Sequence, residues 1–386
     1  MGKEERDEMR LAYVTVALLV MLMAAALLLA GGPFASNALK GKADDPESRS
    51  DRLPGEIFIR RHMVNADGTL KTNLKPQAAA SRDVAQGEES LSESMGLWLQ
   101  YAVQKGDKTL FEQNVGVLQD RFLKDDGWIY WKVGASSEAV STNALIDDLR
   151  IADALYKAGS RWDKPAYTAL ADTISGSIAQ NMVTNEGRFS DFYDHASVWK
   201  SNVLTLSYLQ VSAFKVMYER GKLSEPVYTG AVDFLKNLPT RDTWFPFSYD
   251  SDKGTYLYND EINWIDQLYI VYHRAQAGIP SDEVWSLLKE QFNKYGVLYG
   301  RYHAQSKLPA VDFESPAAYG LAILSAVELG DRDFAQTLYY RMLRFQILNP
   351  ANEWYGGFVF DDDTHIFDNL VPLLAERKMY DEGLLR

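Results

Sequence analysis

Three acidic segments of the sequence contain the residue types that acid–base catalysis needs. In the first, residues 91–103 (LSESMGLWLQYAV), Ser92 has the position of a helix N-cap and Glu93 follows in the first turn, where the helix dipole favours negative charge. Gly96 and Leu97 lie about one turn further on the same side, so the carboxyl group stands above a small residue and an apolar surface. Such surroundings raise the pKa of a carboxyl group and leave room for a ligand. Glu93 is therefore either a capping residue or a catalytic acid.

The second segment, residues 142–156, has two adjacent aspartates within an apolar pattern at helical spacing. Asp148 falls on the apolar stripe, and the neighbours of Asp147 are scarcely more polar. A carboxylate that faces a protein core is costly, so it normally has a partner or a chemical task. The partner would be Arg150 or Arg301, and at this point both interpretations stay open.

The third segment, residues 258–264 (YNDEINW), follows an aromatic stretch and leads into a predicted helix. Asp260 has the position of an N-cap or first-turn residue, which is its structural interpretation. Trp264 comes one turn later and would place an aromatic face beside the carboxylate, as in a sugar-binding site.

Other motifs are weaker. Residues 250–254 (DSDKG) resemble the start of a calcium loop, but the glycine comes one place early and the fifth position lacks a ligand, so we expect a turn. Residues 361–365 (DDDTH) contain cation-ligand types and are better explained as a cap of the last helix. The sequence has no cysteine, no glycine-rich phosphate loop and no nucleophile elbow. We predict neither a metal nor a cofactor.

The composition limits the class of protein. With 386 residues, 46% hydrophobic and 24% charged, the chain has a globular profile. Its net charge of −13 argues against duplex nucleic acid as a partner, because such binding needs basic surface to neutralise phosphates. Aromatic residues make up 12% of the chain, which suits stacking against the apolar C–H faces of sugars. A lipoprotein anchor, which needs an acylated cysteine, is excluded.

The N-terminal region predicts a membrane anchor. Residues 11–30 are an uninterrupted apolar run, about 30 Å long as a helix and so able to span a bilayer. Lys3, Arg6 and Arg10 precede it, which favours a cytoplasmic segment at residues 1–10 and an exported body. We expect an uncleaved single-pass helix, with a signal peptide cleaved near residues 35–38 as the alternative. Residues 31–52 read as a flexible tether, and residues 53–386 as the main domain.

The main domain is predicted to be all-α. Pairs of helices are joined by very short glycine-containing turns, which indicates helical hairpins, and longer aromatic loops connect one hairpin to the next. We therefore expect one repetitive helical domain. The twelve predicted helices are residues 54–63, 92–104, 107–123, 142–158, 164–181, 201–220, 224–238, 261–277, 281–295, 315–329, 331–346 and 363–377.

The three acidic segments, in this order on a chain of twelve helices, resemble glycoside hydrolase family 8 of clan M. Ser92-Glu93 is similar to the family's Ser-Glu-Gly segment, which carries the general acid. Residues 128–133 (WIYWKV) resemble the aromatic segment that follows, with Trp131 at the position of a sugar-stacking tryptophan. The glycine after the acid is Ser94 in this chain.

The remaining segments extend the resemblance. Asp148 is similar to the second aspartate of the family's Asp-Ala-Asp motif, although the sequence here reads Ile146-Asp147-Asp148 and leaves Asp147 as a competitor. Ser207-Tyr208 matches a Ser-Tyr pair of an inner helix. Asp260 falls where many members have the general base, while Asn263 replaces the arginine that usually follows.

The resemblance implies an (α/α)6 toroid of six hairpins and an inverting glycosidase (EC 3.2.1.-). Glu93 would be the general acid and Asp260 the general base, with their carboxyl groups about 6.5–9.5 Å apart. Asp148 would hold the sugar at the cleavage point. The expected substrate-binding residues are Asp147, Trp131, Tyr208 and Trp264.

A membrane-tethered member resembles the hydrolases that accompany bacterial exopolysaccharide synthesis. The expected partners are therefore a polysaccharide, the membrane and the synthesis machinery, with the catalytic domain outside the cytoplasm. Three alternatives are a polysaccharide-binding protein without catalysis, a helical scaffold whose carboxylates do not converge, and a polysaccharide lyase with a Tyr or His base near an arginine or a metal.

Overall fold

The computed structural model of the chain describes residues 52–77, 84–134 and 140–385. The predicted membrane segment at residues 11–30 lies outside these ranges. Within them, no helix combines the length and the apolar character that crossing a bilayer requires.

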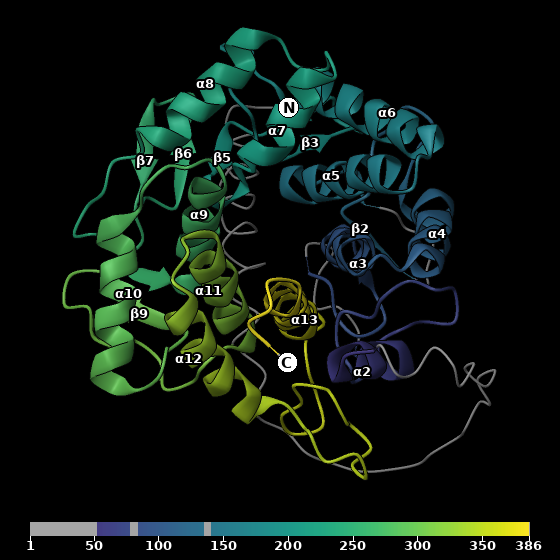
Figure 1. Cartoon of the computed structure of the whole chain (residues 1–386). Coiled ribbons are helices and arrows are strands. Elements are labelled where there is room, and N and C mark those ends of the chain that lie inside the picture. Colours follow the sequence, from purple (N-terminus) through teal and green to yellow (C-terminus); the bar gives the residue numbers. More distant parts are fainter. Residues whose placement is uncertain (1–51, 78–83, 135–139, 386) are drawn as a thin grey trace.

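Twelve α-helices within the described residues form an inner and an outer ring, seen end-on in Figure 1. The predicted (α/α)6 toroid is thereby confirmed for the described part of the chain. The inner helices are α3 (Ser92–Lys105), α5 (Leu145–Arg161), α7 (Val211–Glu219), α9 (Trp264–Gln276), α11 (Pro316–Glu328) and α13 (Phe367–Asp381). The outer helices are α2 (Pro54–His62), α4 (Lys108–Val117), α6 (Pro165–Met182), α8 (Glu225–Lys236), α10 (Asp282–Tyr295) and α12 (Arg332–Met342).

The inner ring is closed. Each inner helix packs against the next one along the chain, and α13 packs back against α3. Each of the first five inner helices packs against the outer helix that follows it, whereas α13 packs against α2, so the two ends of the domain meet in one hairpin. Figure 1 shows α13 and α2 on neighbouring sides of α3.

Burial explains which helices became inner and which outer. Nearly every residue of α11 is buried, in agreement with its apolar sequence on all sides, PAAYGLAILSAVE. In the outer helix α8, the buried residues are Ala231 and Leu235, which lie one turn apart on a single face. A helix that is apolar all round needs neighbours on every side, and an amphipathic helix needs them on one side only.

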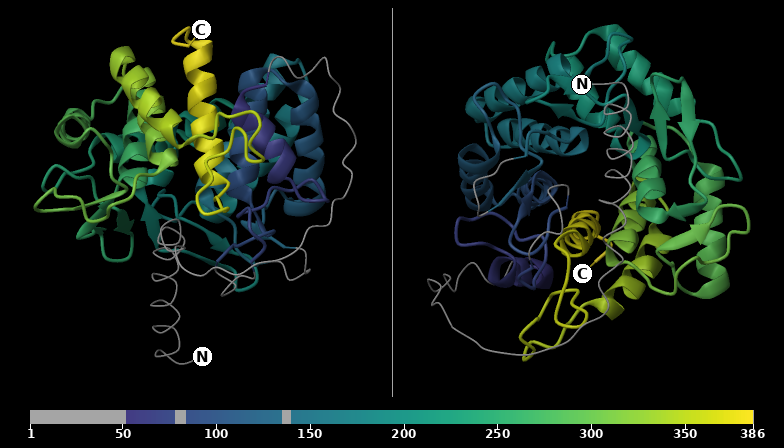
Figure 2. Two further views of the ribbon diagram at one scale, coloured as in Figure 1. Left: turned by 90° about the horizontal axis from the view of Figure 1, so that it is seen from below. Right: turned by 180° about the vertical axis from the view of Figure 1, so that it is seen from behind.

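Short strands and short helices complete the domain. They precede or connect the inner helices, and Figure 2 shows strands at the end of the ring away from the C-terminus of α13. The strands are β1 (Ser90–Leu91), β2 (Lys132–Val133), β3 (Tyr193–Asp194), β4 (Trp199–Lys200), β5 (Val203–Thr205), β6 (Ser248–Asp250), β7 (Thr255–Leu257), β8 (Glu261–Asn263) and β9 (Arg301–His303), all paired antiparallel. The π-helix η3 (Leu118–Phe122) and the 3-10 helices η4 (Leu206–Tyr208) and η5 (Leu343–Phe345) follow α4, β5 and α12.

Four helices begin three or more residues later than predicted, at Leu145, Val211, Trp264 and Phe367, and in two of them a strand lies among the first predicted residues. Residues 201–210, predicted as helix, contain strand β5 and the 3-10 helix η4, because residues 203–205 pair with residues 248–250. Residues 261–263, also predicted as helix, form strand β8, which pairs with β9. Helix α9 begins only at Trp264, where the side chain of Asn263 accepts a hydrogen bond from the backbone N–H of Ile265. In both places strand pairing with a distant segment overrides the local helical pattern.

Candidate active site

Glu93 lies in the first turn of α3, at the start of the inner ring. The pairing of β1 with β2 fixes this turn, and the backbone N–H of Ser92 donates to the carbonyl oxygen of Trp131 at 2.9 Å. Ser92 is not the N-cap that the sequence predicts, because the helix already includes it and Leu91 takes the N-cap position. Its hydroxyl group instead donates to Oδ2 of Asp147 at 2.8 Å. The start of α3 is thereby tied to the start of α5.

A buried arginine joins the two acidic segments. Nη1 of Arg150 lies 3.2 Å from Oδ1 of Asp147 and 3.9 Å from Oε2 of Glu93. The side chain of Glu93 is 30% exposed, whereas those of Asp147 and Arg150 are 8% and 5% exposed. Glu93 therefore has access to a ligand, and the pair behind it is fixed in the protein.

Gly96 allows this close approach. A β-carbon at Gly96 would meet the β-carbon of Arg150 at 3.0 Å and Cγ1 of Ile151 at 3.4 Å, so α3 and α5 touch at this point through a residue without a side chain. Gly96 is one turn after Glu93, as the sequence predicts, and the β-carbon of Arg150 of the next helix lies against it.

The surroundings of Glu93 allow its carboxyl group to stay partly protonated near neutral pH. Burial and, after it, the negative charges of Asp147 and Asp368 raise the pKa of Glu93 to about 7, against the opposing positive charge of Arg150. Burial also raises the pKa of Asp147, against the effect of Arg150 and of the Ser92 hydroxyl group. A carboxyl group with a pKa near 7 can donate a proton at physiological pH.

Asp148 points away from this cluster. Its Oδ2 accepts a hydrogen bond from Nδ2 of Asn143 at 2.6 Å, and Asn143 also contacts the sulfur of Met182 on α6. The residue is 2% exposed, and burial raises its pKa well above the usual range. Consecutive residues of a helix differ by about 100° in direction. Asp147 accordingly shares the mouth of the ring with Glu93, and Asp148 faces the outer helix α6.

Helix α9 and the 3-10 helix η4 add a third group of polar side chains. The hydroxyl group of Ser207 donates to Oδ1 of Asp266 at 3.3 Å. Burial raises the pKa of Asp266 to about 7, against the effects of this hydrogen bond and of Arg301. Tyr208 is half-buried, and burial raises its pKa, with the negative charges of Asp191, Asp147, Glu93 and Asp266 acting in the same direction.

Tyr269 lies beneath the arginine. The guanidinium carbon of Arg150 is 5.0 Å from the centroid of the Tyr269 ring, a cation–π distance. The first turn of α13 adds Asp368, which accepts from the hydroxyl group of Ser315 and from the backbone N–H of Ala317, both at 3.1 Å. First turns of four inner helices thus contribute carboxyl groups to one end of the ring.

Asp260 lies outside this network. Its side chain is exposed just before β8, and its carboxylate makes no hydrogen bond or ion pair with any residue that the structure describes. The backbone carbonyl oxygen of Asp260 accepts from the N–H of Ala304 at 2.8 Å, which holds the loop beside β9. The predicted base is therefore positioned by its backbone, and its carboxyl group is open to solvent.

The two predicted stacking tryptophans differ. Trp131 is partly exposed next to the start of α3, and Nζ of Lys132 lies 5.7 Å from the centroid of its ring. Trp264 is 0% exposed and packs edge-on against Trp244 and Tyr302. Its predicted role as a sugar-stacking residue is wrong. Because strand β8 takes residues 261–263, α9 begins only at Trp264, and the indole side chain packs in the core.

Sequence reasoning missed Asp266 and Asp368. Asp266 stands in the apolar segment WIDQLYIV, the same signal that identified Asp147 and Asp148, but the predicted early start of this helix concealed its first-turn position. Arg150, one of two partners considered for the aspartate pair, is confirmed as the partner of Asp147. The other, Arg301, lies 3.9 Å from Glu261.

Metal binding has no support within the described ranges. There, no group of three or more His, Asp or Glu side chains is arranged to hold a metal ion. Residues 250–254 form the expected turn, in which the backbone N–H of Lys253 donates to the side chain of Asp250. In residues 361–365, Asp363 accepts from the backbone N–H groups of Thr364 and Lys75.

Comparison with known proteins agrees with this arrangement. Residues 55–224 match the model of the glycosyl hydrolases family 8. The chain is 34% identical, over 376 residues, to "Putative lipoprotein YdaJ" of Bacillus subtilis (strain 168), with 97% of this chain and 99% of that protein covered.

Solved structures show the same fold. A novel alpha-amylase from Clostridium perfringens is 25% identical with a TM-score of 0.77, covering 87% of this chain and 99% of that one. The endo-beta-1,4-glucanase CMCax from Acetobacter xylinum is 15% identical with a TM-score of 0.60, covering 85% of this chain and 97% of that one.

The raised pKa of Asp266 predicts a pH effect on stability. The folded protein holds this proton more tightly than the unfolded chain, so Asp266 costs stability as the pH rises from the ordinary aspartate range through about 7. Asp266→Asn should therefore reduce the fall in the thermal unfolding midpoint between pH 5 and pH 8. The exposed residue Asp312 supplies the control, Asp312→Asn, which should leave the fall unchanged. If the unfolding midpoints of the wild type and both variants fell equally with pH, the claim that the Asp266 carboxyl group is buried would be contradicted.

Proposed function

Since the chain belongs to the glycosyl hydrolases family 8 and is a glycoside hydrolase, we propose that it cleaves a polysaccharide by direct displacement with inversion. The single observation that carries the proposal is the Glu93 carboxyl group. It is partly exposed at the mouth of the ring, it has a pKa near 7, and it stands beside a fixed pair of Asp147 and Arg150.

Glu93 is the proposed general acid. A glycosidic oxygen is a poor leaving group, so it needs a proton as the bond breaks. The burial of Glu93 and the nearby charge of Asp147 favour the protonated carboxyl group, which is the form that donates. When the proton leaves, the new carboxylate faces Arg150 at 3.9 Å, and this positive charge stabilises it.

Asp260 is the proposed general base. Its exposed carboxyl group can contact a water molecule, and the loop that carries it is held to β9 through its backbone. Asp266 is the rival that the structure introduces, because it lies on the first turn of α9 near Tyr208 and has a pKa near 7. Either residue would remove a proton from the water that attacks the anomeric carbon.

The sugar at the cleavage point is proposed to bind between α3 and α5. We assign Asp147 to this position ahead of Asp148, because Asp147 shares Arg150 with Glu93 while Asp148 faces Asn143. Tyr208 and Trp131 would hold the sugar ring, since both are partly exposed next to these carboxyl groups.

The proposed substrate is an exopolysaccharide at the cell surface, met by an enzyme that residues 11–30 tether to the membrane. The relative described as a lipoprotein supports membrane association. This chain has no cysteine, so its attachment would depend on the apolar run and not on a lipid. The synthesis machinery of the polymer is the proposed neighbour in the membrane. A polysaccharide-binding protein without catalysis is the alternative, and product analysis separates the two.

Glu93→Gln should lower kcat by about 100- to 10,000-fold with little change in polymer binding, because the amide keeps the shape of the side chain and cannot donate a proton. The polymer extracted from the source organism is the substrate, and reducing ends released per minute are the measurement. The control is Glu290→Gln, an exposed glutamate of α10. Loss of binding together with turnover would remove Glu93 from the role of acid. Unsaturated products would instead indicate a lyase.

The base is identified by chemical rescue. Loss of the true base should lower kcat strongly, and azide should restore the rate, since azide attacks without losing a proton. We expect this behaviour in Asp260→Asn, and a smaller effect without rescue in Asp266→Asn. The reverse pattern would transfer the role to Asp266. Gas or liquid chromatography of the glycosyl azide, alongside thermal unfolding of both variants, separates rescue from misfolding.

A further inference from the structure

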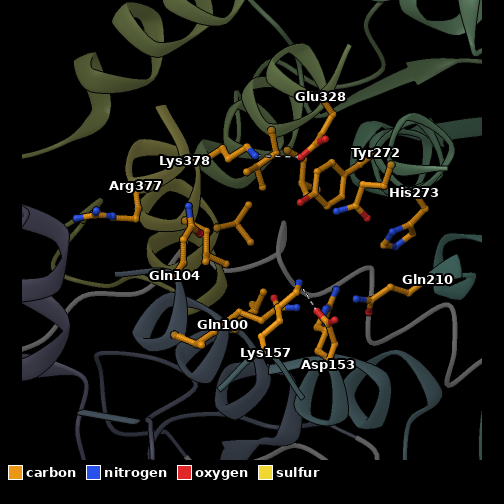
Figure 3. Close-up of a pocket in the computed structure, with 18 of the residues that line it drawn as sticks. Gln100, Gln104, Asp153, Lys157, Gln210, Tyr272, His273, Glu328, Arg377 and Lys378 are labelled. Atoms are coloured by element: carbon orange, nitrogen blue, oxygen red, sulfur yellow. Dashed lines mark hydrogen bonds and ion pairs between the residues drawn. The ribbon is translucent and has the colours of Figure 1, made fainter. Parts of the chain in front are cut away.

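A cavity lies toward the end of the ring opposite the carboxyl groups. Its volume is about 550 Å³, and residues of the inner helices α3, α5, α9, α11 and α13 line it together with Gln210, which precedes α7. We call it the rear cavity. Figure 3 shows side chains from α3, α5, α9, α11 and α13 around it, among them Gln100, Asp153, Tyr272, Glu328 and Lys378. A volume of this size lies within the range of about 300–1,000 Å³ that is usual for small-molecule sites.

Three buried polar side chains of the rear cavity have unused hydrogen-bonding atoms. Oε1 of Gln210, the hydroxyl group of Tyr269 and both ring nitrogens of His273 form no hydrogen bond with the residues that the structure describes. These residues are 5%, 9% and 3% exposed. Gln276 and the backbone of Ser207 lie near the imidazole without a well-aligned hydrogen bond to it. Buried polar groups are almost always paired, so three at one cavity indicate a site for a polar ligand.

The same groups are neutral. An amide oxygen and a phenol carry no charge, and burial together with the charge of Arg150 lowers the pKa of His273 to about 3, so its imidazole is neutral at pH 7. A hydroxyl group can donate to the Gln210 oxygen, and it can donate to or accept from the Tyr269 hydroxyl group and the imidazole.

Two pairs of oppositely charged side chains also line the rear cavity. Nζ of Lys157 lies 2.6 Å from Oδ2 of Asp153, and Nζ of Lys378 lies 3.3 Å from Oε1 of Glu328. Figure 3 marks both pairs. Arg150 also lines the cavity, but its guanidinium group is already bound to Asp147. These pairings favour a neutral ligand over an anion or a cation.

We propose that the rear cavity binds a neutral saccharide of one or two sugar units. Its unpaired groups match the mixed donors and acceptors of sugar hydroxyl groups. Tyr269 and Tyr272 offer aromatic surface, and Leu97, Leu321 and Val371 offer apolar surface, to the C–H faces of the rings.

Glu93 does not line the rear cavity. Arg150 and Tyr269 stand between the two, because Arg150 contacts the carboxyl groups on one side and both residues line the cavity on the other. The proposal therefore goes beyond the hydrolase reaction and does not depend on which residues perform it. The kinetics of Glu93→Gln test the proposed hydrolase reaction, and sugar binding tests the rear cavity. Either proposal can therefore be contradicted without the other.

The test is isothermal titration calorimetry of the full-length chain with cellobiose and maltose, two neutral disaccharides that differ in linkage, and with glucuronate as the charged probe. Gln100→Trp fills the rear cavity from α3. Gln113→Trp is the matched control, at an exposed glutamine of the outer helix α4. Gln210→Leu removes one unpaired acceptor and retains most of the side-chain volume.

For at least one neutral disaccharide, the wild type and Gln113→Trp should each have one more binding site per chain than Gln100→Trp. Gln210→Leu should weaken that site by about three- to tenfold, the usual effect of one lost hydrogen bond. Identical titrations of all four proteins, or binding of glucuronate alone, would overturn the proposal. Thermal unfolding reports whether Gln100→Trp folds. If it does not, an unchanged affinity in Gln210→Leu would by itself overturn the proposal.

Discussion

The structure depends on one buried cation, the guanidinium group of Arg150. It lies 3.2 Å from Asp147 of its own helix α5, 3.9 Å from Glu93 of α3 and 5.0 Å from the Tyr269 ring of α9, so one side chain links three inner helices. Two carboxylates and one guanidinium group carry a net negative charge. In a poorly solvated site, that excess is relieved when one carboxyl group keeps its proton. Glu93, the more exposed of the two, is the group that can exchange this proton with a substrate.

The toroid supplies the positions of these groups. The carboxyl groups of Glu93, Asp147, Asp266 and Asp368 come from first turns of α3, α5, α9 and α13, where the helix dipoles partly offset the cost of negative charge. Strands β1, β2, β8 and β9 hold two of these turns in place. Toward the opposite end, the rear cavity contains the unpaired neutral groups of Gln210, Tyr269 and His273. One ring of helices therefore offers two chemically different ends.

Much of this fold follows from the sequence because it rests on local patterns. Helix α10 was predicted at residues 281–295 and is observed at Asp282–Tyr295, since its apolar stripe and short flanking turns are both local signals. The errors at residues 201–210 and 261–263 come from strand pairing with residues that are distant in the chain, which no helical periodicity reveals. The burial of Trp264 follows from the second of these errors.

The sequence likewise predicts part of the candidate active site. The first-turn position of Glu93 and the apolar surroundings of Asp147 and Asp148 are visible in the sequence. The choice between the two aspartates is not, because it depends on the rotation of α5 relative to α3 and on the contact at Gly96. The rear cavity could not be predicted at all, since Gln210 and His273 come from different hairpins and nothing in their local sequences distinguishes them.

The central claim is that burial and the negative charge of Asp147 keep the pKa of Glu93 near 7, against the opposing positive charge of Arg150. The most direct measurement is a pH titration of the Glu93 carboxyl group by infrared difference spectroscopy, with Glu93→Gln identifying its band, in the wild type and in Arg150→Gln. We predict a midpoint near pH 7 in the wild type and a higher one in Arg150→Gln, because the positive charge that lowers this pKa is lost. An ordinary glutamate midpoint in the wild type, unaffected by the loss of Arg150, would contradict the claim.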